Sequence, residues 1–162
     1  MPIRKRRLYW DSSCFIAVFN AQPTTPPAQL DALQATFEEM LDGKVKIVTS
    51  DAYRAEVFGK GRPEERVIAE QFEACPDFEI VPLRTQAWDM AAEMRRRCDA
   101  AKPSRKLKTV DAVHVAGGTI ARADEIWTTD EKLVKYYEAG LLTVVKVCLP
   151  YLTQLRIPFK RS

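Results

Sequence analysis

The chain has 162 residues, a length that suits one domain rather than two. Its residues are 46% apolar and 29% charged, which provides for a core and a hydrated surface and excludes a disordered, collagen-like or coiled-coil chain. The net charge of +3 is compatible with nucleic-acid binding but does not require it. A single histidine, His114, excludes zinc sites built from two or three histidines and nucleases that use paired imidazoles.

The four cysteines stand far apart in the chain, at Cys14, Cys75, Cys98 and Cys148. They form no C-x-x-C pair and no cluster with the histidine, so a structural zinc site is not expected. Their apolar or helical contexts predict buried free thiols. No apolar stretch approaches 18 residues and no signal-peptide cleavage site follows the basic N-terminus, so we expect a cytoplasmic protein that does not span a membrane.

Short apolar runs that alternate with helical patterns predict the elements of the fold. The predicted strands are Leu8–Trp10, Val45–Val48, Phe78–Val81, Ile126–Thr128 and Thr143–Val147. Apolar residues at helical spacing predict helices over 30–40, 67–75, 88–98 and 131–138. A further helix, rich in small residues that would allow close packing, is predicted to begin at Asp111.

This alternation of strands and helices in a short chain predicts an α/β fold. We expect three α/β/α layers around a short-stranded, mainly parallel sheet. Neither of the two proline-containing breaks in the pattern changes the composition enough to mark a domain boundary. The prediction is therefore a single domain over residues 1–162, with its core at about 7–150 and a C-terminal tail at 151–162.

Four acidic residues are predicted to lie at one edge of this sheet. Asp11 directly follows the first strand, and Asp130 stands just past the fourth. Glu56 lies in the helix after the second strand, and Asp111 begins the helix that leads into the fourth. Because the carboxyl ends of parallel strands share one edge, the four side chains can converge there. Each acid alone is more simply a helix cap or a hydrated group, but the apolar residues around Asp11 and Asp130 favour a functional role.

Four carboxylates in one cleft require shared protons or a cation. Each close pair would repel by roughly 3 kcal/mol at ~5 Å with an effective dielectric constant near 20. Oxygen ligands without histidine or cysteine select Mg²⁺ or Mn²⁺. An ion held by a few carboxylates suits phosphoryl transfer. The residues therefore predict a Mg²⁺ or Mn²⁺ centre that acts on a phosphate.

Four segments that carry these acids resemble the motifs of PIN-domain ribonucleases, especially the VapC-type toxins of bacterial and archaeal toxin–antitoxin pairs. The segments are LYWDSSCFI at 8–16, TSDAYRAEV at 49–57, VDAVHVA at 110–116 and WTTDEKL at 127–133. In that family a Ser or Thr follows the first Asp, another stands six residues before the Glu, and a Thr stands two residues before the last Asp. Ser12, Ser50 and Thr128 match these positions, and the motifs keep the family's order from residue 8 to about 150.

The resemblance implies a PIN-like fold and a metal-dependent endoribonuclease that cleaves RNA. The catalytic acids would be Asp11, Glu56, Asp111 and Asp130. Asp11 and Asp111 would be the primary ligands of Mg²⁺ or Mn²⁺, and the other two acids would bind directly or through water. Ser12 and Thr128 would help to orient water at the metal. The resemblance further implies an antitoxin protein as partner and a homodimer.

The basic residues allow two interpretations. Residues 95–108 contain seven basic side chains and one acid, and they run directly into the helix of Asp111. They form either a hydrated helix end favoured by the helix dipole or a rim that binds RNA phosphates. The candidate RNA contacts are Arg105, Lys106 and Lys108. A second basic run, at 4–7, is predicted to be a solubilising or antitoxin-contacting arm.

The role of His114 and the exact function stay open at this point. His114 shares a helical face with Asp111, so it either contacts substrate or carries a proton, or it is a hydrogen-bonded, half-buried residue, which is the commoner case. A phosphatase with an Asp nucleophile would resemble haloacid dehalogenases, which usually carry a second Asp where this chain has Ser13. The chain could also be a non-toxin PIN nuclease of RNA processing, or a degenerate PIN fold that only binds RNA or protein.

Overall fold

Parallel strands form the centre of the computed structural model, which describes residues 4–20, 24–59, 63–101 and 106–152. The strands are β1 (Arg6–Trp10), β2 (Val45–Ser50), β3 (Phe78–Val81), β4 (Glu125–Trp127) and β5 (Lys146–Cys148). They pair in the order β3-β2-β1-β4-β5, and every pair is parallel. The chain thus builds outward from β1 in both directions, so the carboxyl ends of β1 and β4 form a topological switch point, where sites of such sheets usually lie.

All five predicted strands form; β3 has the predicted bounds, and the other four have shifted ends. The largest difference is in β5, which begins at Lys146 rather than at Thr143. The Thr143 hydroxyl accepts a hydrogen bond from the backbone N–H of Val145 and so closes a turn. Val144 is 96% exposed at this turn, which a strand in the core would not allow.

Helices connect consecutive strands. Their bounds are α1 (Ser12–Asn20), α2 (Pro27–Leu41), α3 (Ala52–Phe58), α4 (Pro63–Glu73), α5 (Thr85–Ala101), α6 (Thr109–Ile120) and α7 (Glu131–Glu138). The sequence pattern did not predict α1, because the helix is apolar on nearly every side and therefore shows no stripe. The helix predicted to begin at Asp111 begins two residues earlier, at Thr109, which places Asp111 in its first turn.

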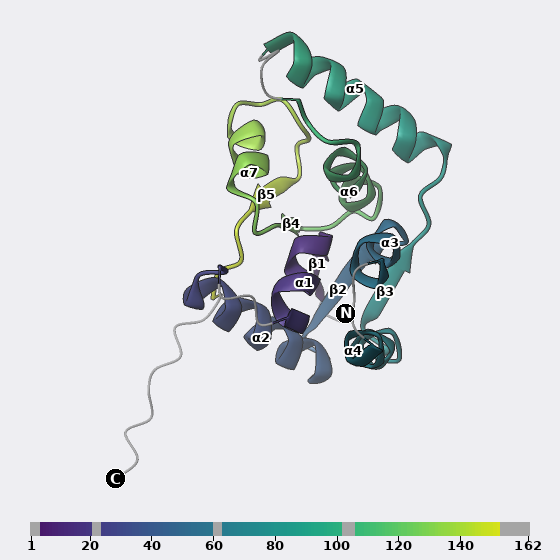
Figure 1. Cartoon of the computed structure of the whole chain (residues 1–162), viewed down its shortest axis with the longest axis vertical. Coiled ribbons are helices and arrows are strands. Elements are labelled where there is room, and N and C mark those ends of the chain that lie inside the picture. The colour runs from purple at the N-terminus through teal and green to yellow at the C-terminus, as the bar shows by residue number, and fades with distance from the viewer. Residues whose placement is uncertain (1–3, 21–23, 60–62, 102–105, 153–162) are drawn as a thin grey trace.

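The helices cover both faces of the sheet, so the predicted three-layer α/β/α architecture is confirmed (Figure 1). Alternate side chains of the strands point to opposite faces. Leu8 and Trp10 pack in the core beneath α1–α4, whereas Tyr9 packs in the core beneath α5–α7. Each layer of helices therefore has its own apolar core against the sheet.

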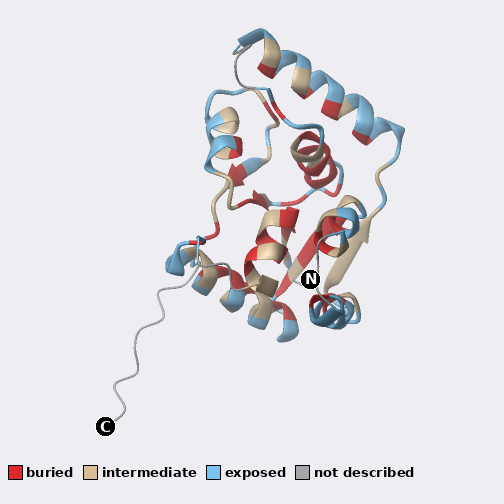
Figure 2. Ribbon diagram, in the orientation of Figure 1, coloured by how far each residue is buried: buried red, intermediate tan, exposed pale blue. Residues whose placement is uncertain are grey.

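Helix α6 lies directly on the sheet because it carries small residues, as the sequence predicted. A Cβ added to Gly118 would meet Ile126 Cγ1 at 2.6 Å, and one added to Gly117 would meet the hydroxyl oxygen of Tyr9 at 3.1 Å. A larger residue at Gly118 would fit only if the Ile126 side chain of the sheet moved. Figure 2 shows α6 buried between the sheet and α5, which is itself exposed on its outer side.

The basic run 4–7 is bound to the sheet and is not a separate arm, contrary to the prediction, whereas contact of this run with an antitoxin stays a prediction. Its side chains form ion pairs with acids near the amino ends of neighbouring strands, at 2.7–3.1 Å: Arg4 with Asp124, Lys5 with Asp77, Arg6 with Glu125 and Arg7 with Glu79. Arg6 and Arg7 belong to β1, which begins two residues earlier than predicted. The paired charges let these arginines enter the sheet.

The remaining expectations about the whole chain have mixed outcomes. All four cysteines are free, but only Cys14 and Cys98 are buried, while Cys75 and Cys148 are half-buried. None of the helices in the described ranges is long and apolar enough to cross a membrane. Most of the predicted tail, 153–162, lies outside the described residues, and Tyr151 and Leu152 are exposed.

Candidate active site

The predicted acids lie around the carboxyl ends of the central strands. Asp11 directly follows β1, and its backbone N–H donates to the carbonyl oxygen of Trp127, the last residue of β4, at 3.1 Å. Asp130 follows the same strand by three residues and caps α7. The structure therefore places these two acids at adjacent strand ends of the switch point.

Asp11 is a buried carboxylate, only 4% exposed, that caps helix α1. Its Oδ1 accepts from the backbone N–H groups of Ser13 at 3.0 Å and Cys14 at 3.4 Å, and also from the Ser13 hydroxyl. These bonds do not involve Oδ2. Burial raises the pKa of Asp11, against the lowering effects of His114 and of the Ser13 hydrogen bond. A helix cap and a ligand role are therefore compatible, because the carboxylate has two oxygens.

Ser13 links the two neighbouring strand ends. Its hydroxyl oxygen donates to Asp11, accepts from the backbone N–H of Thr129 at 2.9 Å and lies 3.4 Å from the Thr128 hydroxyl. Thr128 in turn accepts from the backbone N–H of Asp130 at 3.1 Å. Thr128, predicted as a supporting residue, thus holds the backbone of an acid. The role of Ser13 was missed, although a hydroxyl two residues after an Asp is a usual turn signal.

Asp111 lies in an electrostatically crowded position. It is half-exposed in the first turn of α6, and its pKa is raised to about 6 by burial and by the negative charges of Asp11 and Asp130. Asp130 uses Oδ1 to accept from the backbone N–H of Lys132 at 2.9 Å. The structure therefore brings three of the four predicted acids within electrostatic reach of one another.

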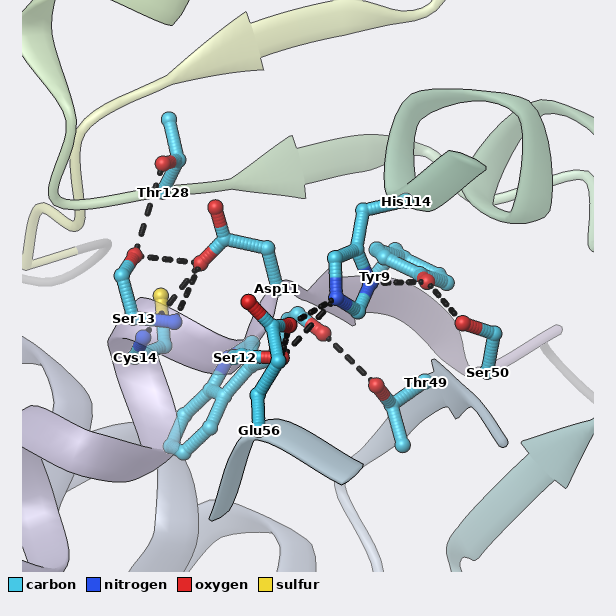
Figure 3. A network of polar contacts seen from close by, with 11 residues as sticks. Tyr9, Asp11, Ser12, Ser13, Cys14, Thr49, Ser50, Glu56, His114 and Thr128 are labelled. Atoms are coloured by element: carbon cyan, nitrogen blue, oxygen red, sulfur yellow. Dashed lines mark hydrogen bonds and ion pairs between the residues drawn. The ribbon is translucent and has the colours of Figure 1, made fainter. Parts of the chain in front are cut away.

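Glu56, the fourth acid, is held by two other side chains of the site (Figure 3). Its Oε2 accepts from the Ser12 hydroxyl and lies 2.8 Å from His114 Nε2. Burial alone would raise the pKa of Glu56, but the hydrogen bonds from His114 and Ser12 outweigh it, and the pKa is lowered. Ser12 thus contacts one of the four acids, while its role in orienting water at a metal stays a prediction.

His114 is 1% exposed and bonded at both ring nitrogens. Its Nδ1 lies 2.8 Å from the Tyr9 hydroxyl, which is hydrogen-bonded in turn to the Ser50 hydroxyl at 2.9 Å. His114 is therefore a hydrogen-bonded residue, as one of the interpretations predicted, and it is more buried than expected, which argues against direct contact with substrate. A role as a proton carrier stays untested. Tyr9 was missed because an aromatic residue in a buried strand carries the pattern of a core residue.

A family model described as the PIN domain matches residues 8–139. The chain belongs to the PIN-domain family. No curated protein sequence matches the chain significantly. The resemblance inferred from the four acidic segments is thereby confirmed at the level of the family.

Solved structures share the fold of this PIN domain. VapBC2 from Rickettsia felis, bound to a promoter DNA fragment, has 14% identity and a TM-score of 0.61 over 88% of this chain and 98% of its own. VapC20 from Mycobacterium tuberculosis, described as a sarcin–ricin loop cleaving toxin, has 16% identity and a TM-score of 0.60 over 86% and 98%. FitAcB from Neisseria gonorrhoeae has 17% identity and a TM-score of 0.58 over 88% and 97%.

The basic segment of this PIN domain divides into two parts. Arg95 and Arg97 donate to the backbone carbonyl oxygens of Leu107 at 3.1 Å and Leu142 at 3.0 Å. Arg95 therefore holds the segment before α6, and Arg97 holds the segment after α7. Arg96 pairs with Glu93 on the surface of α5. This part of the segment is structural.

The second part of the basic segment lies beside the acids. Lys106 and Lys108 are exposed, and Arg105 lies outside the described residues. Lys108 directly precedes α6, and its charge contributes to lowering the pKa of Glu56. A solvated cation next to the carboxylates fits an interaction with a phosphate better than a purely structural role.

The donor set of the PIN domain fits a hard divalent cation. The acids offer oxygen ligands, and their mutual repulsion at Asp111 is the kind that a cation relieves. Within the ranges that the structure describes, no three His, Cys, Asp or Glu side chains form a ready-made metal cage. Mg²⁺ does not require such a cage, because it keeps several waters and usually binds one or two carboxylates.

Proposed function

We propose that this PIN domain is an endoribonuclease that depends on Mg²⁺ or Mn²⁺ and hydrolyses RNA phosphodiester bonds. The observation that carries the proposal is the crowding of Asp111 by Asp11 and Asp130 at the switch point of a PIN-family sheet. Carboxylates brought together without a matching number of cations raise each other's free energy. A site with this cost supports a functional role rather than a role in stability.

In this proposal Asp11 and Asp111 would hold the metal ion. Glu56 and Asp130 would complete the site directly or through water. When bound, the ion would activate water for attack at phosphorus and offset the charge of the phosphodiester. The protein's own bonds hold the acids in place: Ser13 orients Asp11, and the Asp130 side chain caps α7.

The RNA would approach over the amino end of α6. Lys106 and Lys108 are exposed there and would contact phosphates beside the reacting bond. Arg105 lies outside the described residues and stays a candidate RNA contact because it adjoins Lys106 in the sequence. Neutralisation of these residues is expected to weaken RNA binding more than turnover of bound RNA, since they would not touch the reacting atoms.

We further propose that the protein is the toxin of a toxin–antitoxin pair in the cytoplasm. The support is the similarity of its fold to that of VapC20 and to proteins in complexes such as VapBC2, and a toxin–antitoxin complex from Klebsiella pneumoniae. The partner would be a small inhibitory antitoxin, and the toxin would be a homodimer. Co-purification with the product of the neighbouring reading frame, and the mass of the free protein in solution, test these two points.

The nuclease proposal is tested with purified protein and a panel of structured RNAs. We expect cleavage in Mg²⁺ or Mn²⁺, none in excess EDTA, and recovery when the metal is returned. Because the nucleophile would be water and not the RNA 2′-hydroxyl, the products should carry 5′-phosphate and 3′-hydroxyl ends. The matched control is Asp11→Asn, which keeps the shape of the side chain but removes its charge, and it should be inactive.

Two results would contradict this chemistry. Products with 2′,3′-cyclic phosphate ends would show attack by the RNA itself. Full activity in excess EDTA would remove the metal from the mechanism. A protein that binds RNA but neither binds Mn²⁺ nor cleaves any RNA would instead favour a degenerate PIN fold that serves as a binding module.

A further inference from the structure

We propose that His114 is a positioning residue of this nuclease, which, held by Tyr9, fixes the orientation of the Glu56 carboxylate. The inference rests on the proposed function. It adds a row of hydrogen-bonded side chains that supports one of the four acids, Glu56. This row of hydrogen bonds runs from Ser50 through Tyr9 and His114 to Glu56, with contacts of 2.8–2.9 Å (Figure 3).

The hydrogen bonds fix the direction in which His114 donates. A carboxylate oxygen only accepts, so the contact of Nε2 with Glu56 Oε2 requires a hydrogen on Nε2. The other ring nitrogen meets the Tyr9 hydroxyl, which has a single hydrogen. If Tyr9 donates that hydrogen to Ser50, its oxygen accepts from Nδ1–H; if Tyr9 donates it to a bare Nδ1, its oxygen accepts from the Ser50 hydroxyl. In both arrangements Nε2–H points at the pair formed by Glu56 and Ser12: Nε2 lies 2.8 Å from Glu56 Oε2 and 2.9 Å from the Ser12 hydroxyl oxygen, which itself donates to the same Glu56 oxygen. The positioning role therefore does not depend on the charge of the ring.

The surroundings of His114 leave its ring little freedom to turn. Tyr9 is fully buried and packs edge-on against the imidazole, with ring centroids 5.9 Å apart. On the far side, Gly117 brings the backbone of α6 so close that an added Cβ would lie 3.1 Å from the Tyr9 hydroxyl oxygen. Ser50, whose hydroxyl is hydrogen-bonded to that of Tyr9, is also fully buried. The anchor is thus part of the core, whereas Glu56 is half-exposed.

Two donors act on the same oxygen of Glu56. The Ser12 hydroxyl and His114 both bind Oε2, and Oε1 takes part in neither contact. A carboxylate held in this way loses its rotation and presents its second oxygen in one direction. Glu56 stands on the short helix α3, which has only two buried residues, Tyr53 and Val57. The rigid anchor therefore supplies an orientation that α3 alone holds less firmly.

A residue that acts in this way should change metal binding and turnover, but not RNA binding. Groups that orient metal ligands typically contribute 10–100-fold to metal affinity or activity. Since His114 is 1% exposed, it cannot contact RNA. We therefore expect its loss to lower kcat and weaken Mn²⁺ binding while KM for RNA stays within about twofold.

The experiment compares three variants of the full chain with the wild type. His114→Leu keeps a similar volume without a donor, His114→Gln keeps an amide donor, and Tyr9→Phe removes only the hydroxyl that holds Nδ1. Mn²⁺ affinity without RNA is measured by calorimetry, kcat and KM with a cleaved RNA, and thermal unfolding by circular dichroism. The matched control is Thr119→Val, on the same helix, whose hydroxyl binds Val115 and Thr143 away from the acids.

We expect His114→Leu to lose 10–100-fold in Mn²⁺ affinity and kcat. His114→Gln should recover part of both, Tyr9→Phe should lie between, and Thr119→Val should match the wild type. A folded His114→Leu with wild-type Mn²⁺ affinity and kcat would overturn the inference. If His114→Leu does not fold, Tyr9→Phe decides, and wild-type values in that variant would overturn it. A wild type that neither binds Mn²⁺ nor cleaves RNA would overturn the proposed function instead.

Discussion

The two ends of the sheet both carry carboxylates, but the surroundings of these carboxylates differ. Near the amino ends of the strands, Asp77, Glu79, Asp124 and Glu125 each have a basic partner from the run 4–7. At the carboxyl ends, Asp11, Asp111 and Asp130 lie within reach of one another, and their contacts inside the chain are mostly with hydroxyl and backbone N–H groups.

The pKa values follow this difference. Near the amino ends, hydrogen bonds and the charge of Arg7 lower the pKa of Glu79. Burial alone would raise the pKa of Glu125, but hydrogen bonds from Tyr151 and Trp127 and the charge of Arg6 outweigh it. At the carboxyl ends, burial and like charges raise the pKa of Asp111 to about 6. The surroundings of Glu79 and Glu125 favour their charged forms, whereas Asp111 bears the repulsion of neighbouring carboxylates, which is what the proposed active site would require.

The largest effect should come from Asp111→Asn, which removes a charge from the crowded end. We expect cleavage to fall by more than about 100-fold, beyond the typical loss for a residue that only orients a metal ligand. The unfolding temperature at pH 7.5 should not fall, because the variant relieves repulsion with Asp11 and Asp130. Gel-based cleavage and thermal unfolding measure the two effects. Loss of stability comparable to that of a core mutation would assign Asp111 to the framework instead.

Glu125→Gln makes the matched change at the amino end and should have the opposite outcome. The carboxylate accepts from Arg6 at 2.8 Å, Tyr151 at 2.6 Å and the Trp127 indole at 2.9 Å. The neutral amide weakens the charge-assisted bonds, so we expect a loss of about 1–2 kcal/mol in the free energy of unfolding. Urea denaturation measures it. Cleavage of RNA should stay at the wild-type level, and a large drop in kcat would show that the two ends are coupled.

Much of this comparison could be predicted from the sequence. The apolar runs placed the strands, and the positions of Asp11 and Asp130 after two of them placed these acids at one edge. These features are local, since periodicity and order along the chain are enough to predict which end of a parallel sheet a residue occupies. Helix α1 could not be predicted from the pattern, because its apolar residues cover nearly every side and form no stripe.

The pairing of side chains could not be predicted in the same way. Tyr9 meets His114 across 105 positions of the sequence, and Arg7 meets Glu79 across 72. A pattern shows that a residue faces the core or the solvent, but its partner depends on how strands distant in sequence are aligned. For this reason the sequence did not predict the acidic partners of the basic run 4–7, or the hydrogen bond between Tyr9 and His114.

The pH dependence of stability should separate Asp111 from the paired acids of the amino end. Asp111 has a folded pKa of about 6 against 3.8 for the ordinary group, so its protonation stabilises the fold below pH 3.8 and this contribution is lost as the pH rises through about 6. Glu79 and Glu125 have lowered pKa values, so their contribution is present above pH 4.5 and is lost as the pH falls through their folded pKa values.

For the metal-free protein, we therefore expect the unfolding temperature to rise by a few degrees as the pH is lowered from 7.5 to 5, and to fall below about pH 4.5. Asp111→Asn should reduce the rise in unfolding temperature on acidification, to which the raised pKa of Asp11 also contributes, and should leave the fall below pH 4.5 unchanged. Glu125→Gln should reduce that fall. Because metals compete with protons for carboxylates, Mn²⁺ should stabilise the wild type more at pH 7.5 than at pH 5. An identical pH profile for Asp111→Asn and wild type would contradict the assignment of part of the rise in unfolding temperature to Asp111.

The smallest effect should come from Arg4→Ala, and it tests which charges at the amino end matter. The Arg4 side chain is 65% exposed, so its pair with Asp124 is screened by water, and its loss should cost less than about 0.5 kcal/mol. Arg6 is 28% exposed and binds both Glu125 and Tyr151, so Arg6→Ala should cost about 1–3 kcal/mol in the same urea experiment. Equal losses would mean that the amino end is stabilised by the total charge of the run 4–7 rather than by the buried pairs. A larger loss for Arg6→Ala would show that desolvated, multiply bonded pairs hold the strands together there.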